Sequence, residues 1–277
     1  MIDKGWFNEL ETEDIVAGSI AIQKGSCNSP QPWPSMAIDS DHSLTLADYY
    51  SHLNLSSIKA AQNAAFDITR SPDRQLSHIV RIVDELLRVE NELSSRLSDW
   101  IGDYTGVTQD MSEAINNISK DHSKNTFDPY LIFLHDQILS ISKEREKFIQ
   151  LLESEMPSVA PNLTQMAGPI LAARLISLAG SLEKLAKKPS GTVQVLGAEN
   201  ALFAHLRGHA TSPKHGVIYT HEYISKTEKR LRGAASRTFS GKLAIAARID
   251  YYSGRIDPTL HSELSEKIDR IRSRGRK

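Results

Sequence analysis

The sequence of 277 residues contains a single cysteine, Cys27. One thiol cannot form an intramolecular disulfide, and it cannot build a cysteine-rich zinc site, so both kinds of framework are excluded. No stretch of 18 uncharged apolar residues occurs, so we expect no membrane-spanning helix. The first residues, MIDKGWFNELETEDIV, are acidic and lack the apolar segment of a signal peptide. We therefore expect a cytoplasmic chain in a reducing compartment.

Sequence signatures of catalysis are also missing. The chain has no GxxxxGK[ST] phosphate loop and no GxSxG nucleophile elbow. His205 and His209 stand four apart, as zinc ligands on a helix do, but the glutamate of a HExxH motif is absent. Gly208 predicts that the helix ends before His209, and Arg207 and Lys214 would repel a cation. We therefore expect no metal site.

Charge is unevenly distributed, although the formal net charge is only −1. Residues 187–277 contain 18 Lys and Arg against 8 Asp and Glu, a net of +10, whereas residues 1–186 contain 15 against 26, a net of −11. A basic end on an acidic body is typical of a protein that binds a polyanion with one end. For the last eight residues, RIRSRGRK, a solvated tail is an equally good interpretation.

Residues 1–68 are predicted to form a small α/β module. The segment DIVAGSIAIQKG is rich in β-branched residues and predicts a strand, NSPQPWPS is a proline-broken loop, and TLADYYSHLN and SIKAAQNAAFDITR predict helices. Trp6, Phe7 and Trp33 suit either a core or a surface that faces a partner.

Two stretches repeat apolar residues at alternating steps of three and four, the pattern of a coiled coil. The first seam follows Ser71-Pro72 and comprises Leu76, Ile79, Val83, Leu86, Leu93, Leu97 and Trp100. The second surrounds Asp128-Pro129 and comprises Phe127, Leu131, Leu134, Ile138, Ile141, Phe148 and Leu152. Glu90 and Arg145 occupy the one polar position of each seam.

Two seams of matching length, joined by a polar connector over residues 102–126, predict a long antiparallel helical hairpin over residues 69–156. Each helix would be roughly 40 Å long. A hairpin of this length buries little of itself, so we expect it to pair with a second copy. A bundle closed within one chain is the alternative.

Residues 157–277 alternate helix and turn and predict an all-helical domain. Residues 167–188 (AGPILAARLISLAGSLEKLAKK) predict a buried helix, and residues 190–207 predict a short extended entry followed by a helix. Residues 240–252 predict a further core helix. The sequence as a whole therefore predicts a mainly α protein.

This last domain carries residues suited to nucleic acid. Its candidate phosphate-binding cations are Lys187, Lys188, Arg207, Lys214, Arg230, Arg232, Arg237 and Lys242. Pro213, His215 and Tyr219 offer flat surface on which exposed bases can stack. The SPKHG loop is short and proline-stiffened, so it can present a cation and a ring at little entropic cost.

The order of motifs in this domain resembles a known family. APNL, GPILAARLISLAGSLEKLAKKPS, QVLGAENALF and PKHG, followed by RGAASRTFSGKLAIAARID, resemble the Nop domain of archaeal and eukaryotic box C/D ribonucleoprotein core proteins. The resemblance is dense over residues 159–250, and the predicted hairpin is similar to the family's coiled coil. The short chain without a long Lys-rich tail is more similar to the archaeal form, for which we expect a cytoplasmic location; a eukaryotic form would be nucleolar.

The resemblance implies a non-catalytic scaffold. Its N-terminal module would hold the fibrillarin methyltransferase, its coiled coil would form a homodimer, and its Nop domain would dock on a box C/D guide RNA together with a kink-turn-binding, ribosomal-protein-like subunit. The particle would carry out guided 2′-O-methylation of rRNA or tRNA with S-adenosylmethionine held by fibrillarin, so this chain needs no cofactor. RNA or RNP binding is assigned to Lys187, Asn200, Arg207, Pro213, Lys214, His215, Arg232, Arg237 and Lys242.

The sequence departs from the family pattern at three points. The family's GAEK is GAEN here, with Asn200 in place of a cation, and RGKIAR is RGAASR, with Ala234 in place of another. The family's HFPEL segment is absent after Asp99-Trp100. Two other functions remain open at this point. A spliceosomal-type assembly factor would share the fold, and an RNA-acting nuclease or methyltransferase would need carboxylate clusters or a cofactor loop.

Overall fold

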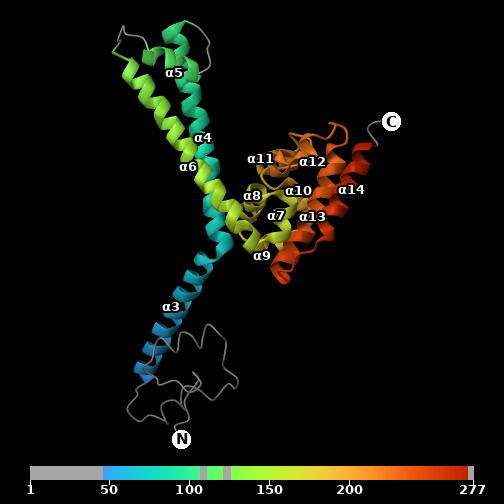
Figure 1. Ribbon diagram of the computed structural model, residues 1–277. Helices are drawn as coiled ribbons and strands as arrows, with labels where there is room; N and C mark the ends of the chain where they lie inside the picture. The colour runs from blue at the N-terminus through green and yellow to red at the C-terminus, as the bar shows by residue number, and fades with distance from the viewer. Residues whose placement is uncertain (1–45, 107–110, 121–125, 274–277) are drawn as a thin grey trace. The chain divides into compact units, whose positions relative to one another are not determined.

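The computed structural model describes residues 46–106, 111–120 and 126–273, and every element in these ranges is helical (Figure 1). The strand predicted near residues 14–25 lies outside the described residues, as do Trp6, Phe7, Cys27 and Trp33. The helices are α3 (Leu46–Arg70), α4 (Pro72–Thr105), α5 (Met111–Lys120), α6 (Asp128–Val159), α7 (Pro161–Ala167), α8 (Pro169–Ala179), α9 (Leu182–Lys187), α10 (Ser190–Val195), α11 (Glu199–Leu206), η1 (Val217–Thr220), α12 (Glu222–Ser225), α13 (Arg232–Tyr252) and α14 (Thr259–Ser273). None of these helices is long and apolar enough to cross a membrane.

The chain divides into two compact units, residues 1–71 and 72–277. In the first unit, the two helices predicted before residue 70 form one continuous helix, α3. Within α3, Ser56 and Ala60 are buried, whereas Phe66 and Ile68 are exposed.

In the second unit, α4 and α6 lie side by side as the predicted antiparallel hairpin (Figure 1). They contain 34 and 32 residues, so each is about 50 Å long. Prolines stand at the first turn of each helix, where a missing N–H costs no hydrogen bond. The heptad pattern therefore predicted the helices, and both extend beyond the seams.

Most of the seam residues pack inside this chain, in two separate clusters. At the tip, Leu97, Leu131 and Ile138 pack with residues of α5, and Leu93 and Leu134 pack against them. At the base, Leu76, Val83 and Leu152 enter the core of the C-terminal helices, with Ile79 and Phe148 packed against that core. Leu86 and Ile141, between the clusters, are half-buried.

Two seam positions were predicted wrongly. Trp100 is 37% exposed, and Ile101, at 2%, takes its place in the tip cluster. Phe127 is 54% exposed because it precedes the first turn of α6 as its N-cap. For Trp100, a step of three or of four from Leu97 allowed residue 100 or 101, and the tip packing selected Ile101.

The connector between the hairpin helices contains the helix α5. Its apolar face (Ala114, Ile115 and Ile118) is buried in the tip cluster. The hydroxyl of Tyr104, at the end of α4, donates to Oδ1 of Asp128 at 2.7 Å, which ties the two ends of the connector together.

The apolar run of residues 167–188 is not one helix, as predicted, but the end of α7, then α8 and α9. Gly168 (φ 75°) and Gly180 (φ 95°) adopt left-handed backbone conformations that interrupt the helical path. The predicted extended entry at residues 190–195 is also wrong, because this segment is helix α10. It packs against α13 with Val193 buried, and this contact overrides the strand preference of its β-branched residues.

Helix α13 is the centre of the C-terminal helices and contacts α7, α9, α10, α12 and α14. Asp250 near its end accepts hydrogen bonds from the backbone N–H groups of Asn162 (3.0 Å) and Leu163 (2.8 Å). The Asn162 side chain donates to the same carboxylate at 2.6 Å, so the first turn of α7 is held on α13. We call this contact the Asn162–Asp250 clasp.

Polar contacts join the hairpin to these helices. Arg81 on α4 donates from Nε to Oγ of Ser177 on α8 at 2.9 Å. Arg174 on α8 donates from Nε to both carboxylate oxygens of Asp84 at 2.9 and 3.1 Å. The hairpin base is therefore joined to α8 by apolar and polar contacts together.

Candidate nucleic-acid interface

The loop of residues 213–216 lies against the backbone that precedes α11. Gly216 donates its backbone N–H to the carbonyl of Gln194 at 2.8 Å, and Val217 donates to the carbonyl of Leu196 at 2.7 Å. These two hydrogen bonds hold the loop without any strand being formed, and they bring it beside the start of α11.

Gly216 is required by this close approach. A Cβ atom at this position would lie 1.9 Å from the carbonyl oxygen of Leu196 and 2.7 Å from the carbonyl carbon of Val195. No side chain can be accommodated there, because the atoms in the way belong to the backbone. The side chain of Gln194 also donates to the carbonyl of Lys214 at 2.6 Å, so the loop is held from both ends.

His215 stacks on an aromatic neighbour. Its ring and the ring of Tyr219 lie with centroids 4.6 Å apart and planes 21° apart. The guanidinium carbon of Arg232 lies 5.4 Å from the centroid of the Tyr219 ring. A histidine ring, a tyrosine ring and a guanidinium thus form one group at the N-terminal end of α13.

Arg232 is held by hydrogen bonds within this group. It donates from Nε to the carbonyl of Thr227 at 2.9 Å, from one terminal nitrogen to the hydroxyl of Tyr219 at 3.2 Å, and from the other to the carbonyl of Ser225 at 3.3 Å. All three of its nitrogens make hydrogen bonds. Arg232 therefore fixes the Tyr219 ring relative to the backbone of Ser225 and Thr227.

The surroundings of His215 favour the neutral form of its ring. Burial lowers the pKa of His215 below its ordinary value near 6.5, and the positive charges of Arg232 and Lys214 lower that pKa further. A neutral imidazole is the form that stacks on bases with the least loss of hydration. The loop therefore offers an uncharged ring beside an exposed cation, Lys214.

The other predicted cations differ in how much of their charge is accessible. Arg237 on α13 is exposed, and its guanidinium makes no hydrogen bond or ion pair within the described residues. Arg207, the C-cap of α11, is exposed as well. Lys187 is exposed but pairs with Glu183 in its own helix. Lys242 pairs with Glu263 of α14 and its side chain is only 12% exposed, so it presents little charge to a ligand.

Among the remaining predicted residues, Asn200 lies exposed in the first turn of α11 and Pro213 is half-buried in the loop. The structure thus brings Pro213, Lys214 and His215 together with Arg232, close to the start of α11. Lys187 and Lys242 lie on other parts of the C-terminal helices.

Two other histidines near the loop, His205 and His221, have structural contacts. His205 donates from Nδ1 to the carbonyl of Ala210 at 2.9 Å. Helix α11 ends at Leu206, and Gly208 has a φ of 77°, as the sequence suggested. His221 caps α12 by accepting the backbone N–H of Tyr223 at Nδ1, and its ring packs on Phe239 with centroids 4.5 Å apart.

Sequence reasoning missed Gln194 and the partner of the Tyr219 hydroxyl. Gln194 lies 20 residues before the carbonyl that it binds, and Arg232 lies 13 residues after Tyr219. No local pattern signals either contact, because each depends on how separate helices pack.

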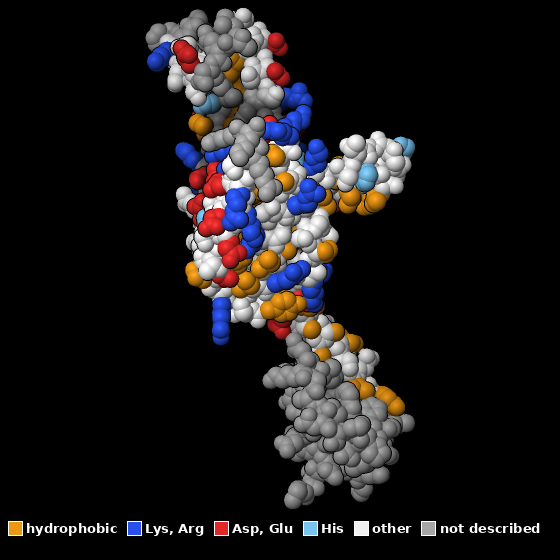
Figure 2. All heavy atoms as spheres, turned by 90° about the vertical axis from the view of Figure 1, so that its right-hand side faces the viewer, with side chains coloured by type: hydrophobic (Ala, Val, Ile, Leu, Met, Phe, Trp, Pro, Cys, Tyr) orange, Lys and Arg blue, Asp and Glu red, His pale blue; other side chains and the backbone are white. Residues whose placement is uncertain are grey.

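Behind the loop lies an open cavity of about 560 Å³ between α4, α8 and η1. Its lining includes Arg81, Arg174, Gly216 and Tyr219. Figure 2 views the side of the C-terminal helices, where Lys and Arg side chains lie among hydrophobic ones, with a group of Asp and Glu side chains on the same face. The arrangement suits binding of a polyanion and has the stacking rings of a nucleic-acid surface.

Comparison with known proteins shows which chains this one is similar to. A family model described as "Nop: snoRNA binding domain, fibrillarin" matches residues 74–270. An uncharacterized NOP5 family protein of Methanocaldococcus jannaschii is 47% identical over 137 residues, which cover 50% of this chain and 33% of the relative. Nucleolar protein 56 of Schizosaccharomyces pombe is 35% identical over 176 residues, 63% of this chain and 35% of the relative. The match therefore spans about a third of the length of these relatives.

A solved structure is similar over nearly the whole chain. A chain in a crystal structure of a fibrillarin/Nop5p complex is similar with a TM-score of 0.54 and 25% identity. The similarity covers 92% of this chain and 91% of that chain.

Proposed function

The chain belongs to the Nop family, and from this premise we propose that it is a non-catalytic scaffold of a box C/D ribonucleoprotein. It would bridge a guide RNA and its kink-turn-binding protein to the fibrillarin methyltransferase, for guided 2′-O-methylation of rRNA or tRNA. The family match over residues 74–270 carries the proposal, because it spans the hairpin and the loop together.

The loop geometry supports an RNA-docking role. A neutral His215 ring, stacked on Tyr219 and next to the exposed Lys214, combines the stacking surface and the cation that single-stranded or looped RNA requires. Arg237 and Arg207 add exposed cations to the same domain. Lys242 has a structural role instead: its ion pair with Glu263 joins α13 to α14.

The partners follow from the family. Fibrillarin is the partner of the similar chain in the solved complex, and we propose that residues 1–68 hold it here. The methyl donor, S-adenosylmethionine, would be bound by fibrillarin and no cofactor by this chain. The location would be cytoplasmic in an archaeon and nucleolar in a eukaryote, as the names of the eukaryotic relatives suggest.

We also propose that the hairpin forms a homodimer. Most of its seam residues are buried within the chain, so a second copy would contact the exposed apolar side chains of the hairpin. Those exposed on α4 and α6 are Ile82, Leu87, Trp100, Tyr130, Phe133, Leu139 and Leu151. Changing Tyr130 and Phe133 together to Asp should convert a dimer to a monomer in sedimentation. Phe203→Asp, on the exposed face of α11, is the matched control and should leave the dimer intact.

Reconstitution tests the scaffold role. The purified protein, mixed with kink-turn-binding protein and guide RNA, should form a ternary complex whose affinity falls steeply as salt rises. Lys214→Ala with His215→Ala should weaken assembly and leave helicity and oligomeric state unchanged. The pure chain alone should transfer no methyl group from S-adenosylmethionine to RNA. Failure to bind either RNA or the RNA–protein pair would contradict the proposal.

A further inference from the structure

A second basic and aromatic surface lies where the end of α9 meets the end of α13. Arg248 of α13 donates from Nε to the carbonyl of Ala186 at 3.1 Å and from a terminal nitrogen to the carbonyl of Lys188 at 3.3 Å. These hydrogen bonds hold the C-terminal ends of both helices together. We call this surface the α9–α13 corner, comprising Lys187, Lys188, Arg248, Tyr251, Tyr252 and Arg255.

Two adjacent tyrosines form the aromatic part of the corner. The rings of Tyr251 and Tyr252 meet edge to face with centroids 4.9 Å apart. Tyr251 is 41% exposed and Tyr252 is 67% exposed, and Ile256 beside them in sequence is 66% exposed. Burying aromatic rings lowers the free energy, so a group of exposed rings indicates a surface that binds a partner.

Four of the six residues of the corner are cations: Lys187, Lys188, Arg248 and Arg255. The pKa of Lys187 is raised above its ordinary value, mainly by Glu183 and to a smaller extent by Tyr251 and Tyr252. Arg248 and Arg255 are exposed, and Lys188 is half-buried.

Nearby carboxylates do not cancel this charge. Glu183 pairs with Lys187, and the Asp250 carboxylate is buried under the N–H groups of the Asn162–Asp250 clasp. Asp257, two residues after Arg255, accepts hydrogen bonds from the N–H and the hydroxyl of Thr259. The corner itself contains four cations and no carboxylate. Exposed rings between cations match the chemistry of a single strand, whose bases have π-faces and whose backbone is anionic.

We propose that the α9–α13 corner binds single-stranded RNA, with one or two bases stacked on Tyr251 and Tyr252 and the flanking phosphates on Lys188, Arg248 and Arg255. The inference rests on the proposed function, because it extends RNA binding beyond the loop. A protein surface would favour a continuous apolar area at the centre, whereas four of the six residues of this corner are cations.

The two RNA surfaces are separated by the length of α13. Arg232 begins this helix and Tyr252 ends it, which is about 30 Å at 1.5 Å per residue. A stacked strand rising roughly 3.4 Å per nucleotide needs about nine nucleotides to span that distance. RNA docked at the loop reaches the corner only if it carries a single-stranded extension of this length.

The test compares two RNAs on the assembled complex. One is a kink-turn RNA ending at its stem, and the other carries a ten-nucleotide single-stranded extension, each bound by the kink-turn protein. Tyr251→Ala with Tyr252→Ala should reduce the affinity for the extended RNA about tenfold and leave the affinity for the short RNA unchanged. Phe at both positions should retain the wild-type affinity, since stacking needs the ring and not the hydroxyl.

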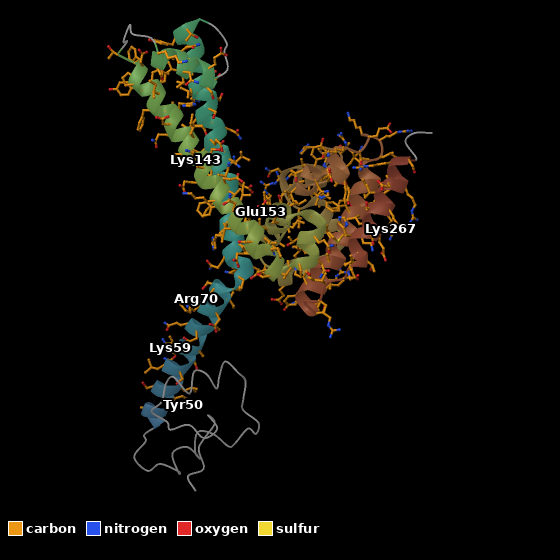
Figure 3. The ribbon with its side chains drawn as sticks, viewed as in Figure 1. Tyr50, Lys59, Arg70, Lys143, Glu153 and Lys267 are labelled. Atoms are coloured by element: carbon orange, nitrogen blue, oxygen red, sulfur yellow. The ribbon has the colours of Figure 1, made fainter. Side chains whose placement is uncertain are left out.

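Charge variants give a second readout. Lys188→Gln with Arg255→Gln should reduce the salt dependence of binding for the extended RNA only. Lys267→Gln, at an exposed position on α14 labelled in Figure 3, is the matched control and should change neither RNA.

Each remaining outcome overturns one of the two proposals. Tyrosine variants that bind the extended RNA as the wild type does, or that lose both RNAs equally, overturn the inference. Loss of the kink-turn protein without loss of RNA would make the corner a protein contact, which also overturns it. If the chain binds a free ten-nucleotide strand through the tyrosines but ignores kink-turn RNA, the corner stands and the scaffold proposal fails.

Discussion

Arg145 donates a hydrogen bond from Nε to Oε2 of Glu90 at 2.8 Å, across the α4–α6 hairpin. These two residues are the only polar positions within the predicted seams, and both side chains are about one-fifth exposed. Their pairing joins α4 to α6 at a point along the hairpin between the tip cluster and the base cluster. An antiparallel hairpin with this pair has one register in which both polar groups are satisfied.

Removing one partner of this pair should lower the free energy of unfolding more than replacing both partners does. Glu90→Ala leaves the Arg145 guanidinium without its acceptor in a partly buried site, and we expect a loss of about 1–3 kcal/mol in the free energy of unfolding. Glu90→Leu with Arg145→Leu should recover most of that loss. Urea denaturation measures both, and Glu92→Ala, which breaks only an exposed pair with Arg88, should change little.

Gly216→Ala should displace the loop. The added Cβ meets the Leu196 carbonyl oxygen, which belongs to a backbone fixed by its own hydrogen bond, so the strain falls on the loop. We expect the affinity for the RNA–protein pair to fall about tenfold or more, at a strain of roughly 1–3 kcal/mol. Gly191→Ala, where an added Cβ has no neighbour within 4 Å, is the control. Equal affinities for both variants would contradict the assigned loop geometry.

Arg232 and Arg237 should act differently, although they are five residues apart on one helix. Arg232→Ala removes the donor to Tyr219 and a positive charge near His215, so the pKa of His215, followed by NMR, should rise. Arg237→Ala removes an exposed cation and should lower the RNA affinity and its salt dependence while leaving that pKa unchanged. A His215 pKa that responds equally to both changes would argue against the positioning role.

Stability should fall as the pH is lowered from 7 to 5. Burial is the main cause that lowers the pKa of both His215 and His221 in the folded chain. The unfolded chain therefore takes up these protons first, so stability present above pH about 6.5 is lost as the pH falls toward the folded-state pKa values. His221→Asn keeps an acceptor for the Tyr223 N–H and cannot be protonated, so its unfolding free energy should depend less on pH in this range. Urea denaturation at several pH values measures both slopes.

The sequence predicted the hairpin because heptads are a local signal. Steps of three and four identified Leu76, Leu97 and Leu131 as inward-facing, and the polar positions Glu90 and Arg145 could be read from the same pattern. The pattern could not assign these residues to one interface, since an apolar side chain facing inward packs equally well on its own hairpin or on a partner.

Breaks in the apolar run were harder to predict. Gly168 and Gly180 interrupt the segment of residues 167–188, yet a glycine within an apolar pattern is compatible with a continuous helix. At the candidate interface, the resemblance assigned Lys242 to RNA, but its burial against Glu263 depends on α14, which lies further along the chain. Charge can be read from a sequence, whereas its accessibility depends on tertiary packing.

The Asn162–Asp250 clasp imposes an order of events during synthesis. The N–H groups of the first turn of α7 have no side-chain acceptor until Asp250 is translated, 88 residues after Asn162. At a ribosomal rate of 5–20 residues per second this takes roughly 4–18 s. The hairpin tip, whose contacts all lie before residue 139, is complete much earlier. A nascent chain would therefore carry a folded hairpin tip while the core of the C-terminal helices is still exposed, and this interval is when a chaperone would be needed.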